Sequence, residues 1–182
     1  MNIPHILNTS NKKKQAEFKR LFSLYNHEIS FLNQHIDEIN APAVEVLQHK
    51  ISSVNVGVLV EDTSLHVDGH EIGIHVKYMM EEIEMGKYSG TKAVWQVLLG
   101  FANHDGLSYI CQGIINGTLS KKAGDFEFGF AQYFIPDGST ETISQSRNDA
   151  FNARAHAINA LIRKDFFLIT PKKYDFTHYS LQ

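Results

Sequence analysis

Two adjacent acids follow a short apolar run in the first half of the chain. The run 56–60 is apolar and rich in β-branched residues, which predicts a buried strand, and Glu61 and Asp62 come directly after it. Carboxylates at such a position cost little only if they face a cleft or bind a cation, and Mg²⁺ meets both conditions. Ligands of open α/β sheets bind at the carboxyl ends of strands. The alternative is a polar strand end that caps the next turn.

A second candidate site lies near the start of the chain, where an apolar segment gives way to the polar stretch Thr9–Lys14. If a strand turns into a helix here, unpaired backbone N–H groups, the helix dipole and the lysines can all face an anion. The stretch is not a Walker loop, because it lacks the glycines and the terminal Gly-Lys-Ser/Thr of that motif. The alternative is a solvated helix start.

Two further groups of residues have side chains suited to nucleotide binding. Asp37 and Glu38 precede a predicted helix that carries Lys50, and by themselves these are surface charges. The segment Phe128-Gly129-Phe130 is followed about twenty residues later by Asn152-Ala153-Arg154, which together offer aromatic faces for stacking and a guanidinium for a phosphate or a base. Core aromatics and a solvated arginine are the alternative.

The elements that must position these residues alternate along the chain. Hydrophobic periodicity and turn residues predict strands at 3–8, 28–32, 56–60, 108–115, 118–120 and 133–135, with turns at 116–117 and 137–138. The same criteria predict helices at 16–25, 44–54, 73–83, 91–99 and 149–163, and an aromatic tail, 166–182, that folds back on the body. The pattern favours an α/β fold with two lobes around a central nucleotide cleft.

Composition limits the class of protein. A chain of 182 residues with 43% hydrophobic and 20% charged residues is typical of one globular domain, so we expect a single domain over 1–182. A formal net charge of −3 gives no support for nucleic-acid or membrane binding. The single cysteine, Cys111, indicates no disulfide and reads as a small apolar strand residue. No signal pattern or membrane span is visible, so we expect a cytoplasmic protein.

The order of these motifs is informative. Five groups of residues follow one another at compatible spacings. They are Thr9, Asn11 and Lys14 near the start, then Glu38, the segment Glu61-Asp62-Thr63-Ser64-Leu65, the segment 73–78 (Gly-Ile-His-Val-Lys-Tyr), and the segments 128–130 and 134–139. In this order and over roughly residues 3–162, the chain resembles the inosine/xanthosine triphosphate pyrophosphatase family. The resemblance implies a twisted mixed sheet with flanking helices, a homodimer, and Mg²⁺-dependent hydrolysis of deaminated purine triphosphates such as ITP, dITP and XTP to the monophosphate and pyrophosphate.

The resemblance also implies a role for each matching residue. Glu38 and Asp62 would hold Mg²⁺, and Asp62, together with Glu61, would orient or deprotonate the attacking water. The residues that would contact the substrate are Thr9, Asn11, Lys14, Lys50, Thr63, Ser64, Lys77, Phe128, Gly129, Phe130, Asn152 and Arg154. A triphosphate carries about four negative charges, so lysines and a metal ion are needed before water can approach phosphorus.

Three departures from the family pattern affect the base rather than the phosphates. Phe130 and Ala131 stand where the family has tryptophan and aspartate, Ala153 stands where it has histidine, and Ser144-Gln145 replaces the usual alanine and glutamate. Selectivity for ITP or XTP over ATP and GTP is therefore expected to be weaker than the family pattern implies, or to have moved to another modified base. Two hypotheses remain open: a nucleoside triphosphate pyrophosphatase, and a nucleotide-binding regulatory module of the same fold with lost or redirected activity.

Overall fold

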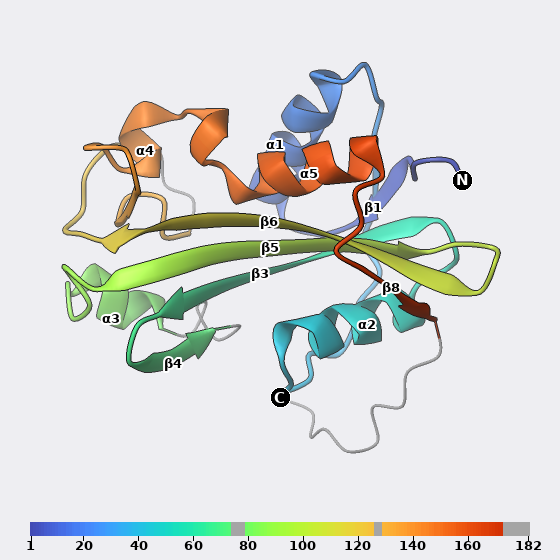
Figure 1. Cartoon of the computed structure of the whole chain (residues 1–182), viewed down its shortest axis with the longest axis horizontal. Coiled ribbons are helices and arrows are strands. Elements are labelled where there is room, and N and C mark those ends of the chain that lie inside the picture. The colour runs from blue at the N-terminus through green and yellow to red at the C-terminus, as the bar shows by residue number, and fades with distance from the viewer. Residues whose placement is uncertain (74–78, 126–128, 173–182) are drawn as a thin grey trace. The chain divides into compact units, whose positions relative to one another are not determined.

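The computed structural model describes residues 1–73, 79–125 and 129–172 (Figure 1). The strands are β1 Ile6–Asn8, β2 Ser30–Leu32, β3 Val58–Val67, β4 His70–Gly73, β5 Lys92–Ala102, β6 Leu107–Leu119, β7 Phe134–Pro136 and β8 Leu168–Pro171. The helices are α1 Lys12–Ser23, α2 Ala43–Ser53, α3 Met80–Glu84, α4 Ile143–Ser146 and α5 Ala153–Arg163, and a 3₁₀ turn at Asp149–Phe151 precedes the last of them.

The strands form a mixed sheet of eight strands, which confirms the predicted α/β class. The order along the sheet is β2-β1-β3-β5-β6-β7, with β4 paired to β3 and β8 paired to β6. β1 runs parallel to both β2 and β3, whereas β4 is antiparallel to β3, and β7 and β8 are antiparallel to β6. The parallel pairs β1–β2 and β1–β3 thus lie in the amino-terminal half of the chain, as expected for strands joined through helices α1 and α2.

The chain divides into two compact units, which agrees with the two predicted lobes. Unit 1 contains Met1–Asp62, Leu98–Gln112 and Ala157–Gln182, and unit 2 contains Thr63–Val97 and Gly113–His156. Strands β3, β5 and β6 and helix α5 each contribute residues to both units. The predicted cleft between the lobes stays a prediction.

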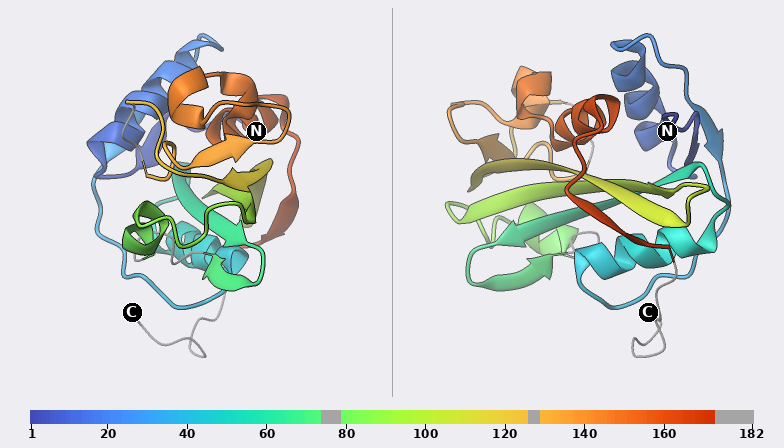
Figure 2. Two further views of the ribbon diagram at one scale, coloured as in Figure 1. Left: turned by 90° about the vertical axis from the view of Figure 1, so that its left-hand side faces the viewer. Right: turned by 45° about the vertical axis from the view of Figure 1, so that its right-hand side comes forward.

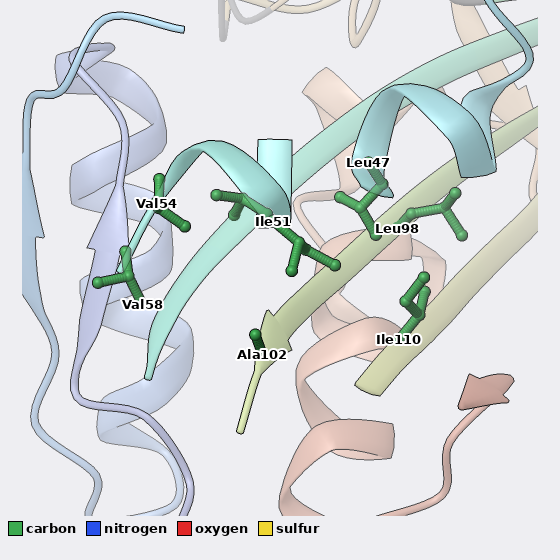
Figure 3. Close-up of a cluster of buried hydrophobic side chains, with 8 residues drawn as sticks. Leu47, Ile51, Val54, Val58, Leu98, Ala102 and Ile110 are labelled. Atoms are coloured by element: carbon green, nitrogen blue, oxygen red, sulfur yellow. The ribbon is translucent and has the colours of Figure 1, made fainter. Parts of the chain in front are cut away.

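The core of unit 1 is built on α2. Figure 3 shows apolar side chains of this helix and of the loop after it directed at the strands. The cluster contains Leu47, Ile51, Val54, Val58, Val60, Leu98, Ala102 and Ile110. Within unit 1, α2 lies on one face of the strands, whereas α1 and the last turns of α5 lie on the other (Figure 2). Both faces of these strands are covered, so their residues are apolar without alternation.

Two predictions about strands were wrong because burial on both faces removes the period-two signal. β3 does not end at Val60 but continues to Val67, so Glu61 and Asp62 lie inside the strand. The predicted helix 91–99 is strand β5, which forms a hairpin with β6 closed by the Asn103 N–H donating to the Leu107 carbonyl at 2.9 Å. Apolar residues on both faces of a strand can mimic helical spacing.

The region around β4 and β6 also differs from the prediction. Instead of one helix over 73–83, Gly73 ends β4 and the described helix is only Met80–Glu84, while residues 74–78 lie outside the described residues. β6 runs without a turn through Asn116-Gly117, where a break between two strands was predicted. The turn at Asp137-Gly138 is confirmed, with Gly138 at a φ of 86°.

Gly117 is required by packing rather than by a turn. A Cβ atom at this position would lie 2.4 Å from the carbonyl oxygen of Ile135 and 2.6 Å from the ring of Phe134 on the paired strand β7. We expect Gly117→Ala to lower the free energy of unfolding by about 1–3 kcal/mol, because backbone atoms cannot move aside cheaply. Urea unfolding measures this loss. Equal stability of the Gly117 variant and the wild type would contradict the packing argument.

Cys111 is the small buried strand residue that the sequence predicts. Its side chain is fully buried in β6, and burial, aided by the charge of Asp165, raises the pKa of the thiol to about 12. The ordinary thiol pKa is near 8.5, so the reactive thiolate is almost absent at pH 8. We therefore expect iodoacetamide to leave the native protein unmodified at pH 8 and to modify it in urea, as mass spectrometry would measure. Rapid alkylation of the native protein would contradict this.

The end of the described chain folds back on unit 1, as predicted for the tail. β8 pairs with β6 from Leu107↔Pro171 to Ile110↔Leu168, and Phe166 packs edge-on against Tyr109 with ring centroids 4.9 Å apart. The Ser52 hydroxyl of α2 donates to the Lys172 carbonyl at 2.9 Å. The rest of the tail, 173–182, lies outside the described residues.

Candidate functional site: an ion-paired cluster and an aromatic–arginine cluster

The loop between β1 and α1 carries the first predicted phosphate ligands. Asn11 is the N-cap of α1, and its Oδ1 accepts from the backbone N–H groups of Lys13 and Lys14 at 3.0 and 3.1 Å. The sequence suggested that the backbone N–H groups of this loop are unpaired. These two are paired instead, because the side chain of the cap residue accepts from both. Thr9 organises the same loop: its Oγ1 accepts from the Asn11 N–H, and its carbonyl accepts from the Gln15 side chain at 2.7 Å.

The two adjacent acids of β3 are each paired with a lysine, on opposite faces of the strand. Successive strand residues point to opposite sides of a sheet. Glu61 Oε2 binds Lys14 Nζ from α1, and Asp62 Oδ1 accepts from Lys50 Nζ of α2 at 2.7 Å. These helices lie on opposite faces of unit 1 (Figures 1 and 2). Although neighbours in sequence, the two carboxylates therefore act on different sides of the sheet.

The Asp62–Lys50 pair is enclosed, which makes its electrostatics strong. The side chains of Asp62 and Lys50 are only 10% and 24% exposed. Burial raises the pKa of Asp62, while the charge and hydrogen bond of Lys50 act in the opposite direction. Burial acts to lower the pKa of Lys50, but the carboxylates of Asp62, Glu61 and Glu38 outweigh it and raise that pKa, so the lysine is held as an ammonium ion. Lys50 also donates to the Glu61 carbonyl at 3.2 Å.

The donor set around Asp62 fits a magnesium ion that takes most of its ligands from water and substrate. Asp62 Oδ2 is buried and has no hydrogen-bond partner among the described residues. Glu38, an exposed residue, contributes a second carboxylate whose field reaches Lys50. Within the described ranges no group of three or more His, Cys, Asp or Glu side chains is placed to hold a metal. Mg²⁺ is often bound by only one or two carboxylates plus phosphates.

Unit 2 contains a separate cluster of aromatic side chains and an arginine. Trp95 of β5 packs edge-on against Phe130, with ring centroids 5.6 Å apart, and the Arg154 guanidinium carbon lies 5.7 Å from the centre of the Trp95 ring. Arg154 Nη2 donates to Thr63 Oγ1 at 3.1 Å. Arg154 is 5% exposed, so it is not the solvated arginine of the alternative interpretation. This cluster unites a planar cation with flat aromatic surfaces.

Asn152 of the predicted base site has a structural role, and the two alanines that depart from the family pattern are buried. Asn152 caps α5, with its Oδ1 accepting from the Arg154 and Ala155 N–H groups at 2.9 and 3.3 Å. Ala131 and Ala153 are buried. The family pattern has polar side chains at these two alanines, and here their methyl groups are packed inside the protein.

Sequence reasoning missed Trp95. It also missed a polar cluster on the face of β3 opposite to Thr63. Trp95 was assigned to a helix, and its buried Nε1 has no hydrogen-bond partner among the described residues. The Ser64 hydroxyl donates to Gln96 Oε1 at 3.1 Å, and the His66 ring lies within 3.2 Å of both side chains. Only the pairing of β3 with β5 could have brought these residues together. Ser64 is buried in this cluster, and its contact with substrate stays a prediction.

Two predicted site residues, Lys77 and Phe128, lie outside the described residues. Gly129 is exposed and has a φ of 53°, in the left-handed region that favours glycine. In the parts of the chain that the structure describes, no helix combines the length and apolar character of a membrane span.

The described chain thus has a mixed α/β sheet, two lysine–carboxylate pairs in unit 1 and an aromatic–arginine cluster in unit 2. The chain belongs to the Ham1 family, whose model matches residues 5–164. A dITP/XTP pyrophosphatase of Pyrococcus horikoshii is 29% identical over 174 residues, covering 87% of this chain and 92% of the relative. An inosine triphosphate pyrophosphatase of Yarrowia lipolytica is 24% identical, covering 88% and 93% of the two chains.

Solved structures agree on the fold. The Ham1 protein of Staphylococcus aureus superposes with a TM-score of 0.66 at 18% identity, covering 88% of this chain and 98% of that protein. A dITP/XTP pyrophosphatase of Mycobacterium abscessus superposes with a TM-score of 0.60 at 20% identity, covering 86% and 96%. The resemblance drawn from the order of motifs is thereby confirmed.

Proposed function

We propose that this protein hydrolyses deaminated purine nucleoside triphosphates, such as ITP, dITP and XTP, to the monophosphate and pyrophosphate. Membership of the Ham1 family and the names of its pyrophosphatase relatives support this substrate class. The observation that carries the proposal is the pairing of Glu61 with Lys14 and of Asp62 with Lys50 in unit 1. These are the charge types needed to bind a triphosphate and to activate water beside it.

The phosphates are bound, in this proposal, by donors of the β1–α1 loop and by lysines. Thr9 and Asn11 offer a hydroxyl and an amide, and Lys14, Lys50 and Lys77 offer ammonium groups. Thr63 and Ser64 follow Asp62 in the sequence and carry hydroxyl groups, although the Ser64 hydroxyl already bonds Gln96. Lysine suits this task because it acts as a compact point charge on phosphate.

Asp62 is the residue we assign to the attacking water. The reaction requires water to bond to the α-phosphorus while the bond from that phosphorus to the bridging oxygen breaks, and the proton of the water must be removed. Asp62 has one oxygen on Lys50 and a second that is unpartnered among the described residues, whereas Glu61 is bound to Lys14 on the other face. Glu61 therefore holds Lys14 in place rather than sharing the base role.

The metal in this proposal is Mg²⁺, held by Asp62 and Glu38. When bound, it supplies charge neutralisation and alignment of the phosphate oxygens. Asp62 orients water and Glu38 adds negative charge beside Lys50.

The base is contacted in this proposal by Phe128, Gly129, Phe130, Asn152 and Arg154. Phe130 supplies an aromatic surface, and Arg154 supplies a guanidinium that carries only donors and therefore prefers a carbonyl on the base to an amino group. Ala131 and Ala153 provide no side-chain hydrogen bonds, so discrimination depends on Arg154 and on backbone groups.

The experiment that tests the function identifies the reaction products and measures nucleotide binding separately. ITP incubated with protein and Mg²⁺ is expected to yield IMP and pyrophosphate on anion-exchange chromatography, and IDP with orthophosphate would contradict the proposed cleavage. Trp95 is the only tryptophan in the chain, so its fluorescence reports nucleotide binding independently of turnover. Binding without hydrolysis across ITP, XTP, GTP, ATP and dUTP would favour the regulatory-module hypothesis.

Three further properties belong to the same proposal. The chain acts as one catalytic domain over 1–182, since three strands contribute to both units. It forms a homodimer, which sedimentation velocity would measure, and it resides in the cytoplasm, as its composition and single cysteine favour.

A further inference from the structure

The structure of the Asp62–Lys50 pair raises the question of how one carboxylate serves a metal while a lysine already binds it. Lys50 Nζ lies 2.7 Å from Asp62 Oδ1, and both groups are largely enclosed. A divalent cation that reaches Asp62 must compete with this ammonium ion. In the same place Lys50 is needed for a phosphate, if the proposed function is right.

We propose that Lys50 stands in for the divalent cation on Asp62 in the metal-free protein and transfers to a substrate phosphate when the cation binds. The inference rests on the proposed function and concerns this pair alone. The lysine prevents a largely buried carboxylate from being left uncompensated, which is among the most destabilising situations in a protein. Each ion then has a partner before and after the exchange.

The charge balance of unit 1 supports an exchange of partners. Lys14 and Lys50 neutralise Glu61 and Asp62, so these two ion pairs together carry no net charge. A cation on Asp62 releases the Lys50 ammonium, and an anionic phosphate stabilises that ammonium. Metal and phosphate should therefore bind cooperatively at this pair, because each removes the cost of the other.

The adjacent pair offers a matched control. Lys14→Met leaves Glu61 without its lysine, as Lys50→Met leaves Asp62, but Glu61 lies on the opposite face of β3 and is not assigned to the metal. Both variants remove one ammonium from the same unit, so a general gain in negative charge would affect them equally. The double variant Lys50→Met/Asp62→Asn removes both charges of the pair and tests whether Asp62 carries the effect.

The test uses Mn²⁺ without nucleotide, followed by electron paramagnetic resonance and by thermal unfolding. Wild type should bind Mn²⁺ weakly, whereas Lys50→Met should bind it at least about 10-fold more tightly. In EDTA the same variant should have a Tm about 5 °C or more below that of wild type, and Mn²⁺ should raise its Tm by much of this difference. Lys14→Met and the double variant should show no such gain. Equal Mn²⁺ affinity of Lys50→Met and wild type, or an equal gain in Lys14→Met, would overturn the proposal.

Transfer of Lys50 to phosphate is tested with pyrophosphate as the probe. Calorimetry should show that Mn²⁺ increases pyrophosphate affinity by a larger factor in wild type than in Lys50→Met. Mn²⁺ also binds pyrophosphate in solution, but that equilibrium is the same for both proteins and does not affect the comparison. Equal increases would overturn the transfer step. None of these measurements uses turnover. If the Mn²⁺ results are as expected but no hydrolysis occurs, only the proposed activity is refuted. If hydrolysis occurs without the expected Mn²⁺ results, only the exchange is refuted.

Discussion

Asp62→Asn is expected to lower kcat for ITP hydrolysis by about 10²–10⁴-fold, because the amide cannot accept the proton of the attacking water and lacks the charge that a metal requires. The substitution preserves the size of a side chain that is only 10% exposed. Steady-state kinetics at saturating Mg²⁺ would measure kcat, and Trp95 fluorescence would show that nucleotide affinity falls by less than turnover.

Asp37→Asn is the matched control for this result. Asp37 lies in the same unit, but its side chain is 69% exposed and forms an ion pair with the exposed His35, so activity should stay near that of wild type. If Asp62→Asn retained full turnover with a normal Tm, Asp62 would be an ordinary strand residue whose carboxylate serves only to neutralise Lys50.

Arg154→Met is expected to lower kcat/KM for ITP by about 10²-fold and to reduce the preference for ITP over ATP. The guanidinium is buried between Thr63 and Trp95, and a site built on buried donors discriminates strongly because the wrong substrate leaves polar atoms unpaired. Arg154→Lys should not restore the preference, since an ammonium group lacks the planar donor geometry. The measurement is kcat/KM for ITP, XTP, GTP and ATP in each variant.

Arg163→Met controls for loss of an arginine from the same helix. Arg163 is exposed in the last turn of α5 and should leave the ratio of ITP to ATP unchanged. The ratio does not depend on the fraction of folded protein, so a loss of stability in Arg154→Met does not confuse the result. An unchanged ratio in Arg154→Met would show that backbone groups near Gly129 read the base instead.

The sequence determined the class of fold and the family from local signals. The helix that begins after Pro42, the strand that leads into Glu61 and the polar loop Thr9–Lys14 were readable because turn residues, caps and apolar periodicity act over a few neighbouring residues. The order of the motifs identified the family without any tertiary information. Cys111 was also correctly predicted, because an isolated cysteine behaves as a small apolar residue and needs no partner to be buried.

Tertiary structure decided the identity of the central strands. Residues 92–102 have apolar residues spaced like a helix, yet they form β5 between β3 and β6, where both faces are buried and the neighbouring strands satisfy the backbone. Gly117 resembled a turn residue, but its lack of a Cβ atom serves the close approach of Phe134. Burial on two faces and contacts between strands are not encoded in local periodicity.

The same distinction holds within the candidate site. The residue types of the charged groups were evident from the sequence, but adjacency in sequence suggested that Glu61 and Asp62 act together. Strand alternation places them on opposite faces, where one binds Lys14 and the other binds Lys50. Trp95 joined Arg154 only through strand pairing and helix packing. Which charges compensate one another depends on distances between residues far apart in the chain, and only the folded structure sets those distances.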